Sequence, residues 1–455
     1  MEMILEFLRD VLSQPALLIG IMSCVGLIAL KRPFHKIMTG TLKPILGYLM
    51  LAAGAGVIVS NLDPLGKMIE HGFHITGVVP NNEAIVAVAQ KVLGVETMSI
   101  LVVGLLMNLL IARFTKFKYV FLTGHHSLFM ACLMSAVLGT VGLSGIELIL
   151  VGGFLMGAWS AISPAIGQSY TSKVTDGDEI ALGHFGSLGY YLSAWVAKYV
   201  GKAEESTEDI EIPEKWGFLR DSTLSTALTM IVFYLIAAIA AGSEFVATLS
   251  DSMSPYLFAV MSAMNFSVGV AIVYSGVRMI LGDLIPAFQG IATKIIPNAI
   301  PAVDCAVFFT YAPTAVVLGF ISSFIGGIIG MLILGAIGGV LIIPGLVPHF
   351  FCGATAGIYG NATGGRRGAA VGAFLNGLAI TFLPALALPV LGQLGFQNTT
   401  FGDADFAVMG LVLGNAFEWI GMAGIYGVVV IAALVLLIPN FIKTKGKVIN
   451  YVEEE

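Results

Sequence analysis

Residues 342–367 read IIPGLVPHFFCGATAGIYGNATGGRR and interrupt an otherwise continuous series of apolar segments. The stretch holds two prolines and six glycines, together with a histidine and several small hydroxyl and amide side chains. Irregular backbone is tolerated at membrane depth only where protein or a water-filled cavity surrounds it, because lipid offers no hydrogen-bond partners. The stretch is therefore a candidate binding site within a membrane protein, although its glycine content is equally typical of an extramembrane loop.

A second interrupted stretch favours the binding-site interpretation. Residues 175–199 read TDGDEIALGHFGSLGYYLSAWVAKY, with a polar start and then a short, partly apolar segment that contains His184. Two short, glycine-interrupted segments in different parts of a chain with many apolar runs point to the binding site of a transporter.

The composition indicates an all-α membrane protein with many spans. Of the 455 residues, 57% are hydrophobic and only 11% are charged, whereas roughly a quarter of the residues in soluble domains are charged. The net charge of -6 and the lack of a basic stripe argue against nucleic acid as a partner. Four cysteines lie singly in apolar runs without metal-ligand spacing, so we expect reduced thiols and neither a metal nor a cofactor. They are Cys24, Cys132, Cys305 and Cys352.

Membrane spans need roughly 17 to 25 mostly apolar residues, and on this criterion the sequence predicts eleven. They lie near residues 15–30, 40–60, 92–112, 119–139, 143–162, 223–241, 256–281, 298–318, 324–343, 368–391 and 406–438. The last run is overlong, so we expect it to tilt or break. Residues 1–12 predict an amphipathic helix in the membrane interface, not a signal peptide, because the basic start and the cleavage site are missing.

The distribution of basic residues predicts the orientation. With the N-terminus outside and the C-terminus inside, all 22 lysines and arginines fall on the cytoplasmic side except Arg9, Lys67 and Lys91. Five spans in residues 1–200 and five in residues 223–438 then have opposite orientations, which is typical of an inverted repeat with one extra span. The charged residues 201–222 are expected to be a solvated cytoplasmic linker, and residues 439–455 a cytoplasmic tail.

Ionisable groups at membrane depth are candidate functional residues, because an unpaired charge in hydrocarbon is costly. His125, His184 and Asp304 are the strongest candidates, since each lies in or beside an apolar run. Glu83 is expected on the outer side, where it is either a site residue or a surface acid. The remaining histidines are interpreted as packing or loop residues. They are His35, His71, His74, His126 and His349.

Several functional classes lack their motifs in this sequence. There is no nucleotide-binding GxxxxGK[ST] loop, no arginine ladder of a voltage sensor and no TVGYG filter of a potassium channel. Two alternatives remain open from the residues alone. One is a cation-coupled symporter for a small organic anion or polyol, with Asp304 and His184 as its proton or sodium site, and the other is a passive channel.

Blocks along nearly the whole chain resemble the membrane component IIC of the ascorbate-type phosphotransferase system (PTS). They are GYLMLAAGAGVIVSNLDPL (47–65), LTGH (122–125), SKVTDG (172–177), AWVAKYVGKAEESTEDIEIP (194–213), AVDC (302–305), YAPTAVVLGF (311–320) and IIPGLVPHFFCGATAG (342–357). The resemblance implies a homodimer in the bacterial inner membrane, with a core domain, a V-shaped dimerisation domain and re-entrant hairpins at the two interrupted stretches. It also implies that a IIB protein bearing a phosphocysteine, supplied by IIA, phosphorylates the transported sugar.

The resemblance assigns substrate-binding residues by position: Ser60, His125, His184, Asp304, Ala354 and Thr355, with Glu83 where the ascorbate carriers have tyrosine. The ascorbate carriers have glutamines four residues after the first histidine and directly after the second. At these places this chain has Phe129, Phe185 and Gly186. We therefore expect a small sugar acid, ascorbate or a related carbohydrate, and expect Phe185 to tune which substrate binds. No cysteine lies in an exposed basic loop that would activate a phosphate-accepting thiolate, so the phosphotransferase activity would reside in the partner.

We predict that Ser206 lies in the cytoplasm, on the strength of the asymmetry in basic residues. A cysteine placed there by Ser206→Cys, with the four native cysteines replaced by serine, should react with an impermeant maleimide only after the cells are opened. Labelling from the outer face of intact cells would contradict the orientation.

Overall fold

The computed structural model describes Val11 and residues 14–74, 77–80, 82–210, 222–250, 253–392 and 399–441. The long helices are α2 (Pro15–Ala29), α3 (Phe34–Phe73), α4 (Asn82–Phe114), α5 (Gly124–Thr140), α6 (Gly145–Thr175), α8 (Ser222–Ala241), α10 (Pro255–Lys294), α11 (Pro313–Ala336), α12 (Leu346–Gly392), α13 (Ala404–Ile420) and α14 (Met422–Phe441). Shorter elements are α7 (Ser187–Val200), α9 (Ser243–Leu249), the 3-10 helix η2 (Cys305–Thr310) and the strands β1 (Val79–Pro80), β2 (Tyr119–Phe121), β3 (Ala181–Leu182), β4 (Ile300–Val303) and β5 (Thr399–Thr400). The predicted interfacial helix at residues 1–12 lies outside the described residues except for Val11.

The helical content confirms a multi-pass membrane protein. Within the described ranges, seven helices are long and apolar enough to cross a membrane, or eight if the bent pair of α8 and α9 forms one span. The predicted span at residues 298–318 is wrong, because this segment forms β4, η2 and only the first turns of α11. Its apolar residues are buried within the protein, and a short buried strand has no periodicity that separates it from a helix.

Two other boundaries follow from local backbone conformation. The predicted span at residues 119–139 begins only at Gly124, because Tyr119–Phe121 is a strand. The overlong run at residues 406–438 breaks, as expected, between α13 and α14. Gly421 occupies the break with φ +62°, a conformation that favours glycine.

The glycine-interrupted stretch at residues 342–367 contains one arm of a helical hairpin. The long α12 is interrupted by non-helical backbone at Gly364 and Gly365, and the second of these has φ +60°. The chain reverses there, since Gly353 before the break and Gly377 after it both pack against Ser323 of α11. The glycines allow these close approaches because they have no Cβ.

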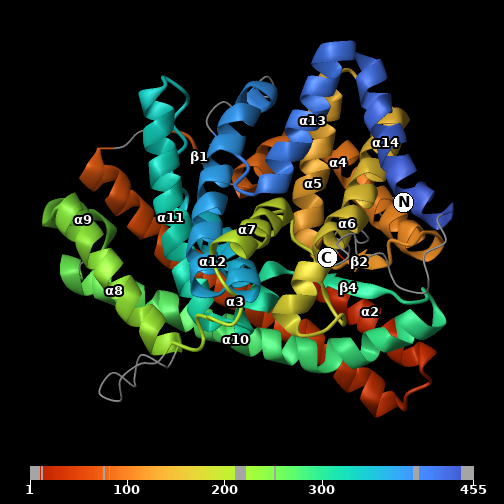
Figure 1. Ribbon diagram of the computed structural model, residues 1–455, viewed down its shortest axis with the longest axis horizontal. Helices are drawn as coiled ribbons and strands as arrows, with labels where there is room; N and C mark the ends of the chain where they lie inside the picture. The colour runs from red at the N-terminus through yellow and green to blue at the C-terminus, as the bar shows by residue number, and fades with distance from the viewer. Residues whose placement is uncertain are drawn as a thin grey trace.

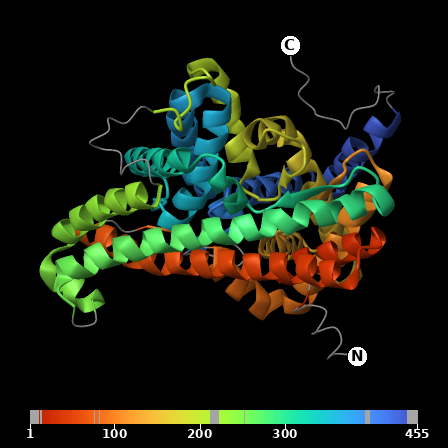
Figure 2. The ribbon, with the colours of Figure 1, turned by 90° about the horizontal axis from the view of Figure 1, so that it is seen from below.

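Helices α3 and α10 form a long antiparallel pair, each of 40 residues. Figure 2 shows them side by side along one face of the molecule, while α5, α11, α12 and α13 stand on top of them in Figure 1. Glycines face each other where they cross: Gly47 packs on Gly276, and Gly54 packs on Gly269. Small residues of this kind let the backbones of membrane helices approach closely.

The order of elements after α2 recurs after α8. A long helix (α3 or α10) leads to a strand (β1 or β4), then to another long helix (α4 or α11) and, after further helices, to a second strand (β3 or β5) followed by a helix (α7 or α13). Helices α3 and α10, which begin the two series, run antiparallel to each other.

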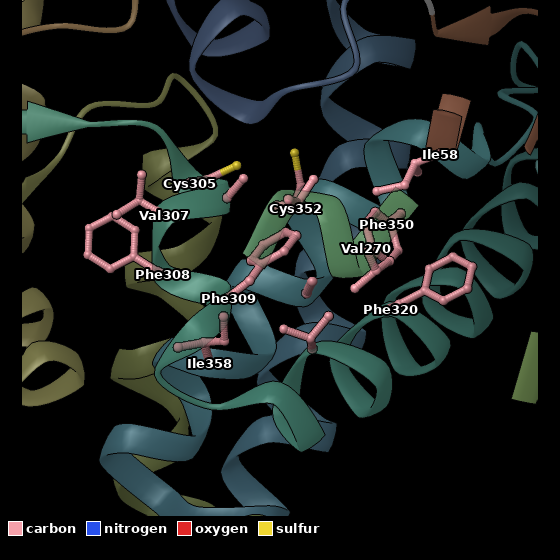
Figure 3. Close-up of a cluster of buried hydrophobic side chains, with 14 of the residues drawn as sticks. Ile58, Val270, Cys305, Val307, Phe308, Phe309, Phe320, Phe350, Cys352 and Ile358 are labelled. Atoms are coloured by element: carbon pink, nitrogen blue, oxygen red, sulfur yellow. The ribbon is translucent and has the colours of Figure 1, made fainter. Parts of the chain in front are cut away.

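An apolar cluster packs η2 and α11 against α12 and the pair of α3 and α10. Figure 3 shows Phe309 in the middle of the cluster, Phe308 and Phe320 on opposite sides of it, and Cys305 and Cys352 at its upper edge. Both thiols are buried and unoxidised, as the sequence predicts.

The first ten residues of the predicted linker pack on the protein. The amide of Thr207 donates to Asn361 Oδ1 at 2.8 Å, and the amide of Arg366 donates to the Glu205 carbonyl at 2.8 Å. The Glu208 carboxylate accepts from the amides of Thr314 and Ala315, each at 3.1 Å, and caps α11. The segment 201–210 therefore fastens the turn of the α12 hairpin, and residues 211–221 lie outside the described part.

We predict opposite effects for two glycine substitutions in α10. A Cβ at Gly276 would collide with backbone atoms of Gly47 and Leu51, whereas a Cβ at Gly282 would meet nothing. Gly276→Ala should lower the melting temperature of the purified protein, and Gly282→Ala should leave it equal or raise it, since alanine favours a helix by about 0.5–1 kcal/mol over glycine. Equal effects of the two substitutions would contradict the close crossing.

Candidate functional site

Three short parallel strands bring together residues that are far apart in the sequence. β4 lies in the centre of a sheet with the order β2-β4-β3, and both pairings are parallel. Parallel strands end at the same edge, so the segments that follow them meet there. These segments carry His125 and His126 after β2, His184 after β3 and Asp304 after β4.

Amide side chains close the two outer edges of this sheet. Asn108 of α4 donates to the carbonyl of Tyr119 and accepts from the amide of Phe121. Gln168 of α6 donates to the carbonyl of Ile180 at 3.1 Å. Buried backbone groups need such partners, and with them strands of a few residues persist inside a helical protein.

A second parallel pair repeats this arrangement and again joins the two halves of the chain. β1 pairs with β5, and Val78 forms an isolated parallel bridge with Ile342. The segment after β1 carries Asn82, and the segment after β5 carries Asp403. The Asn82 amide donates to Asp403 Oδ2 at 2.6 Å, so the ends of these strands also meet.

A cavity of about 980 Å³ lies between the two sets of strand ends. Its wall is formed by one side of α3, by the segments after the strands and by the start of α12. An ion pair of Lys67 and Asp63, with both side chains more than half exposed, lies at its mouth. Its deep end is lined by imidazoles and carboxylates, from His125, His126, His184, Asp304 and Asp403.

His125 is held between a phenol and a carboxylate. Its Nδ1 lies 3.1 Å from the Tyr48 hydroxyl, and its Nε2 lies 3.4 Å from Asp304 Oδ2. Asp304 also caps η2, because its Oδ1 accepts from the amide of Ala306 at 3.0 Å. His125 remains 37% exposed and Asp304 only 8%, so the imidazole faces the cavity and the carboxylate supports it.

The rings of His184 and His126 are in contact, with centroids 3.8 Å apart and planes tilted by 46°. Nδ1 of His184 accepts from the amide of Gly186 at 3.1 Å and lies 2.9 Å from the Tyr190 hydroxyl. Nδ1 of His126 accepts from the amide of Phe185 at 3.3 Å. Because an acceptor nitrogen carries no hydrogen, both neutral rings hold their proton on Nε2. Each therefore presents an N–H donor at Nε2.

Asp405 fixes the backbone that carries His184. Its carboxylate accepts from the amide of Leu188 at 2.9 Å, from the Ser187 hydroxyl at 2.7 Å and from Trp159 Nε1 at 3.1 Å. Its own amide donates to the Phe185 carbonyl at 2.9 Å. The side chain thus caps α7 and holds the segment before it, as N-terminal carboxylates do.

The structure brings Ser60, His125, His184 and Asp304 to the same cavity wall. The Ser60 hydroxyl donates to the Val57 carbonyl and remains exposed, so it lies nearer the mouth than the deep groups do. Glu83 belongs to the first turn of α4, but its side chain lies outside the described residues.

Phe185 lies behind the cavity wall. It is fully buried, stacks on Phe121 with centroids 4.6 Å apart and contacts Phe406 edge-on. Phe129, by contrast, lines the cavity and meets the His125 ring edge-on at 5.8 Å. Of the two phenylalanines, Phe129 is the one placed to contact a ligand.

Ala354 and Thr355 are fully buried in the third turn of α12. Only the first four N–H groups of a helix lack partners within it, so the amides of both residues are used inside α12. The Thr355 hydroxyl donates to the Phe351 carbonyl at 2.7 Å. The first N–H groups of α12, which have no partner within the helix, belong to Leu346 and Val347, and both residues line the cavity.

Several cavity residues were not predicted from the sequence. From the sequence, His126 is interpreted as a packing or loop residue, and Tyr48 is not among the candidates. Asp403 and Asn82 are not among the candidates named from the sequence. The available signal was that both polar residues lie shortly before an apolar run, at residues 406–413 and 84–89.

Comparison with known proteins identifies the family of this chain. A family model named EIIC-GAT, described as the PTS system sugar-specific permease component, matches residues 10–405. The chain is also 26% identical over 417 residues to the ascorbate-specific PTS system EIIC component of Mycoplasma pneumoniae. That match covers 78% of this chain and 62% of the relative, so the chain spans less than two thirds of that protein. Because the family model covers most of the sequence, the chain belongs to the EIIC-GAT family of PTS sugar-specific permease components.

Proposed function

We propose that this protein carries a small, hydroxyl-rich carbohydrate, ascorbate or a related sugar acid, inward across the bacterial inner membrane. A partner IIB protein, supplied with phosphate by IIA, would phosphorylate the carbohydrate on the cytoplasmic side. The observation that carries this proposal is the convergence of His125, His184 and Asp304 on one large cavity in a chain of the sugar-permease family.

The chemistry of the cavity suits a carbohydrate. Ligand sites combine apolar walls with a few polar groups at fixed positions. Imidazoles donate and accept hydrogen bonds, and Asp304 accepts from hydroxyl groups. A buried site that bonds a hydroxyl rejects analogues without it, because its own polar groups are then left unpaired.

The predicted orientation places the cavity mouth on the outer face. The cavity follows α3 from Tyr48 to Glu70, and the end of α3 is the outer end when the N-terminus lies outside. We propose that the two halves form an inverted repeat and that the hairpin arm at residues 342–367 and the stretch at residues 175–199 are re-entrant. The pair of α3 and α10 would belong to the V-shaped domain of a homodimer.

The coupling mechanism can be tested in vesicles. Vesicles that contain only this protein should exchange substrate downhill, and should accumulate phosphorylated product only when IIB, IIA and the general phosphorelay proteins are added. The assay is uptake of labelled ascorbate, xylitol and sorbitol. Accumulation driven by a sodium or proton gradient without the phosphorelay would favour a symporter that uses Asp304 and His184.

His184 should be essential for binding. His184→Ala removes a donor from a buried cavity and leaves substrate oxygens unpaired, which typically costs about 1–3 kcal/mol. Stabilisation of the purified protein against heat by sugar acids and polyols should be lost. His71→Ala is the matched control, because this ring stacks on Phe245 away from the cavity, and it should retain the response. Full binding by the His184 variant would contradict the site.

Two glutamine substitutions should separate selectivity from packing. Phe129→Gln places an amide on the cavity wall and should shift preference toward ascorbate in the same thermal assay. Phe185→Gln buries an amide among aromatic rings, which costs about 1–3 kcal/mol if it finds no partner, and should mainly lower the melting temperature. A change of ligand preference with Phe185→Gln but not with Phe129→Gln would reverse the assignment.

A further inference from the structure

Asp403 approaches the central imidazole from the second half of the chain. Only 6% of its side chain is exposed, it lines the deep end of the cavity, and its Oδ1 lies 3.7 Å from His184 Nδ1. Asp304 approaches the same ring from the first sheet, because ligand atoms of His184, Asp304 and Cys305 lie within 4.8 Å of one another. Two buried carboxylates, one from each set of strand ends, therefore meet at His184.

Both carboxylates retain unused acceptor capacity. Asp403 accepts from Asn82 at 2.6 Å and from the Cys352 thiol at 3.0 Å. Asp304 accepts from the amide of Ala306 and faces His125. An ionised carboxylate offers about four lone-pair sites, so each has roughly two left, and lone pairs in a nearly buried site are costly unless a donor reaches them.

The histidines at this end of the cavity do not complete a metal site. His126, His184 and Asp403 lie close enough for one ion and are ligand types that zinc accepts. Nδ1 of each histidine, however, already accepts a backbone N–H, which leaves the ring proton on Nε2. A metal ligand needs a free lone pair, whereas these rings offer N–H donors that suit a ligand oxygen.

We propose that Asp403 is a second hydroxyl acceptor of the binding site and that the ligand presents neighbouring hydroxyl groups to Asp304 and Asp403. An oxygen of the same ligand accepts from Nε2 of His184. This role for Asp403 rests on the proposed carbohydrate transport and narrows it to ligands with an intact vicinal diol. Such diols occur in polyols, in sugars and in the side chain of ascorbate.

The first test compares Asp403→Asn with Asp283→Asn. Asp283 of α10 pairs with Lys43 of α3 and does not line the cavity, so it is a matched carboxylate control. Binding of ascorbate, xylitol and sorbitol to each purified protein is measured by calorimetry and thermal shift. We expect at least one of them to bind the unmodified protein, Asp403→Asn to weaken that affinity by about tenfold or more, and Asp283→Asn to change it less than twofold.

The failures are distinguishable. If none of the three compounds binds the unmodified protein, the proposed carbohydrate transport is overturned together with the role of Asp403. If a compound binds the unmodified protein and Asp403→Asn equally well, only the role of Asp403 is overturned. Stabilisation by zinc alone that disappears in Asp403→Asn would show a metal ligand and also overturn it.

A second measurement needs no variant and stands even if Asp403→Asn does not fold. Monodeoxy analogues of ascorbate, xylitol and sorbitol are compared with their parents on the unmodified protein. Removal of one hydroxyl of the diol should weaken binding by about tenfold or more, since a buried carboxylate then loses its donor. Equal affinity of every analogue and its parent would overturn the proposal.

Discussion

Main-chain pairing between short parallel strands is the interaction on which the site depends. β4 holds β2 and β3 on its two sides, so three segments that are far apart in the sequence end at one edge. Strands of two to four residues cannot persist alone. They are stable here because helices bury them and because Asn108 and Gln168 bond to the backbone at the outer edges.

The sequence alone identifies the residues of this site whose side chains are ionisable, because burying such a group without a partner costs free energy. His125, His184 and Asp304 are ionisable residues in or beside apolar runs, and the structure places all three on one cavity. The sequence does not predict the strands that position these three residues. The residues of β2 and β4 are buried on every side, so their pattern is the same as that of a membrane helix, and the span predicted at residues 298–318 was the result.

The residues that contact the predicted site residues, such as His126 and Asp403, could not be predicted from the sequence for a different reason. His126 and Asp403 gain their importance from contacts between distant segments, and no local pattern records such contacts. The same holds for glycines in α10. Gly276 lies in a crossing with α3 and Gly282 faces open space, yet both are single glycines within an apolar helix and are alike in the sequence.

The carboxylate of Asp405 ties together two segments that lie far apart in the sequence. This residue starts a helix of the second half, but it closes the end of α7 in the first half and bonds to the segment that carries His184. These hydrogen bonds link the segment that carries His184 to the segment that carries Asp403 at the deep end of the cavity. Drawing α7 away from the start of α13 would break all of these hydrogen bonds, so the segments that carry His184 and Asp403 are held at a fixed separation.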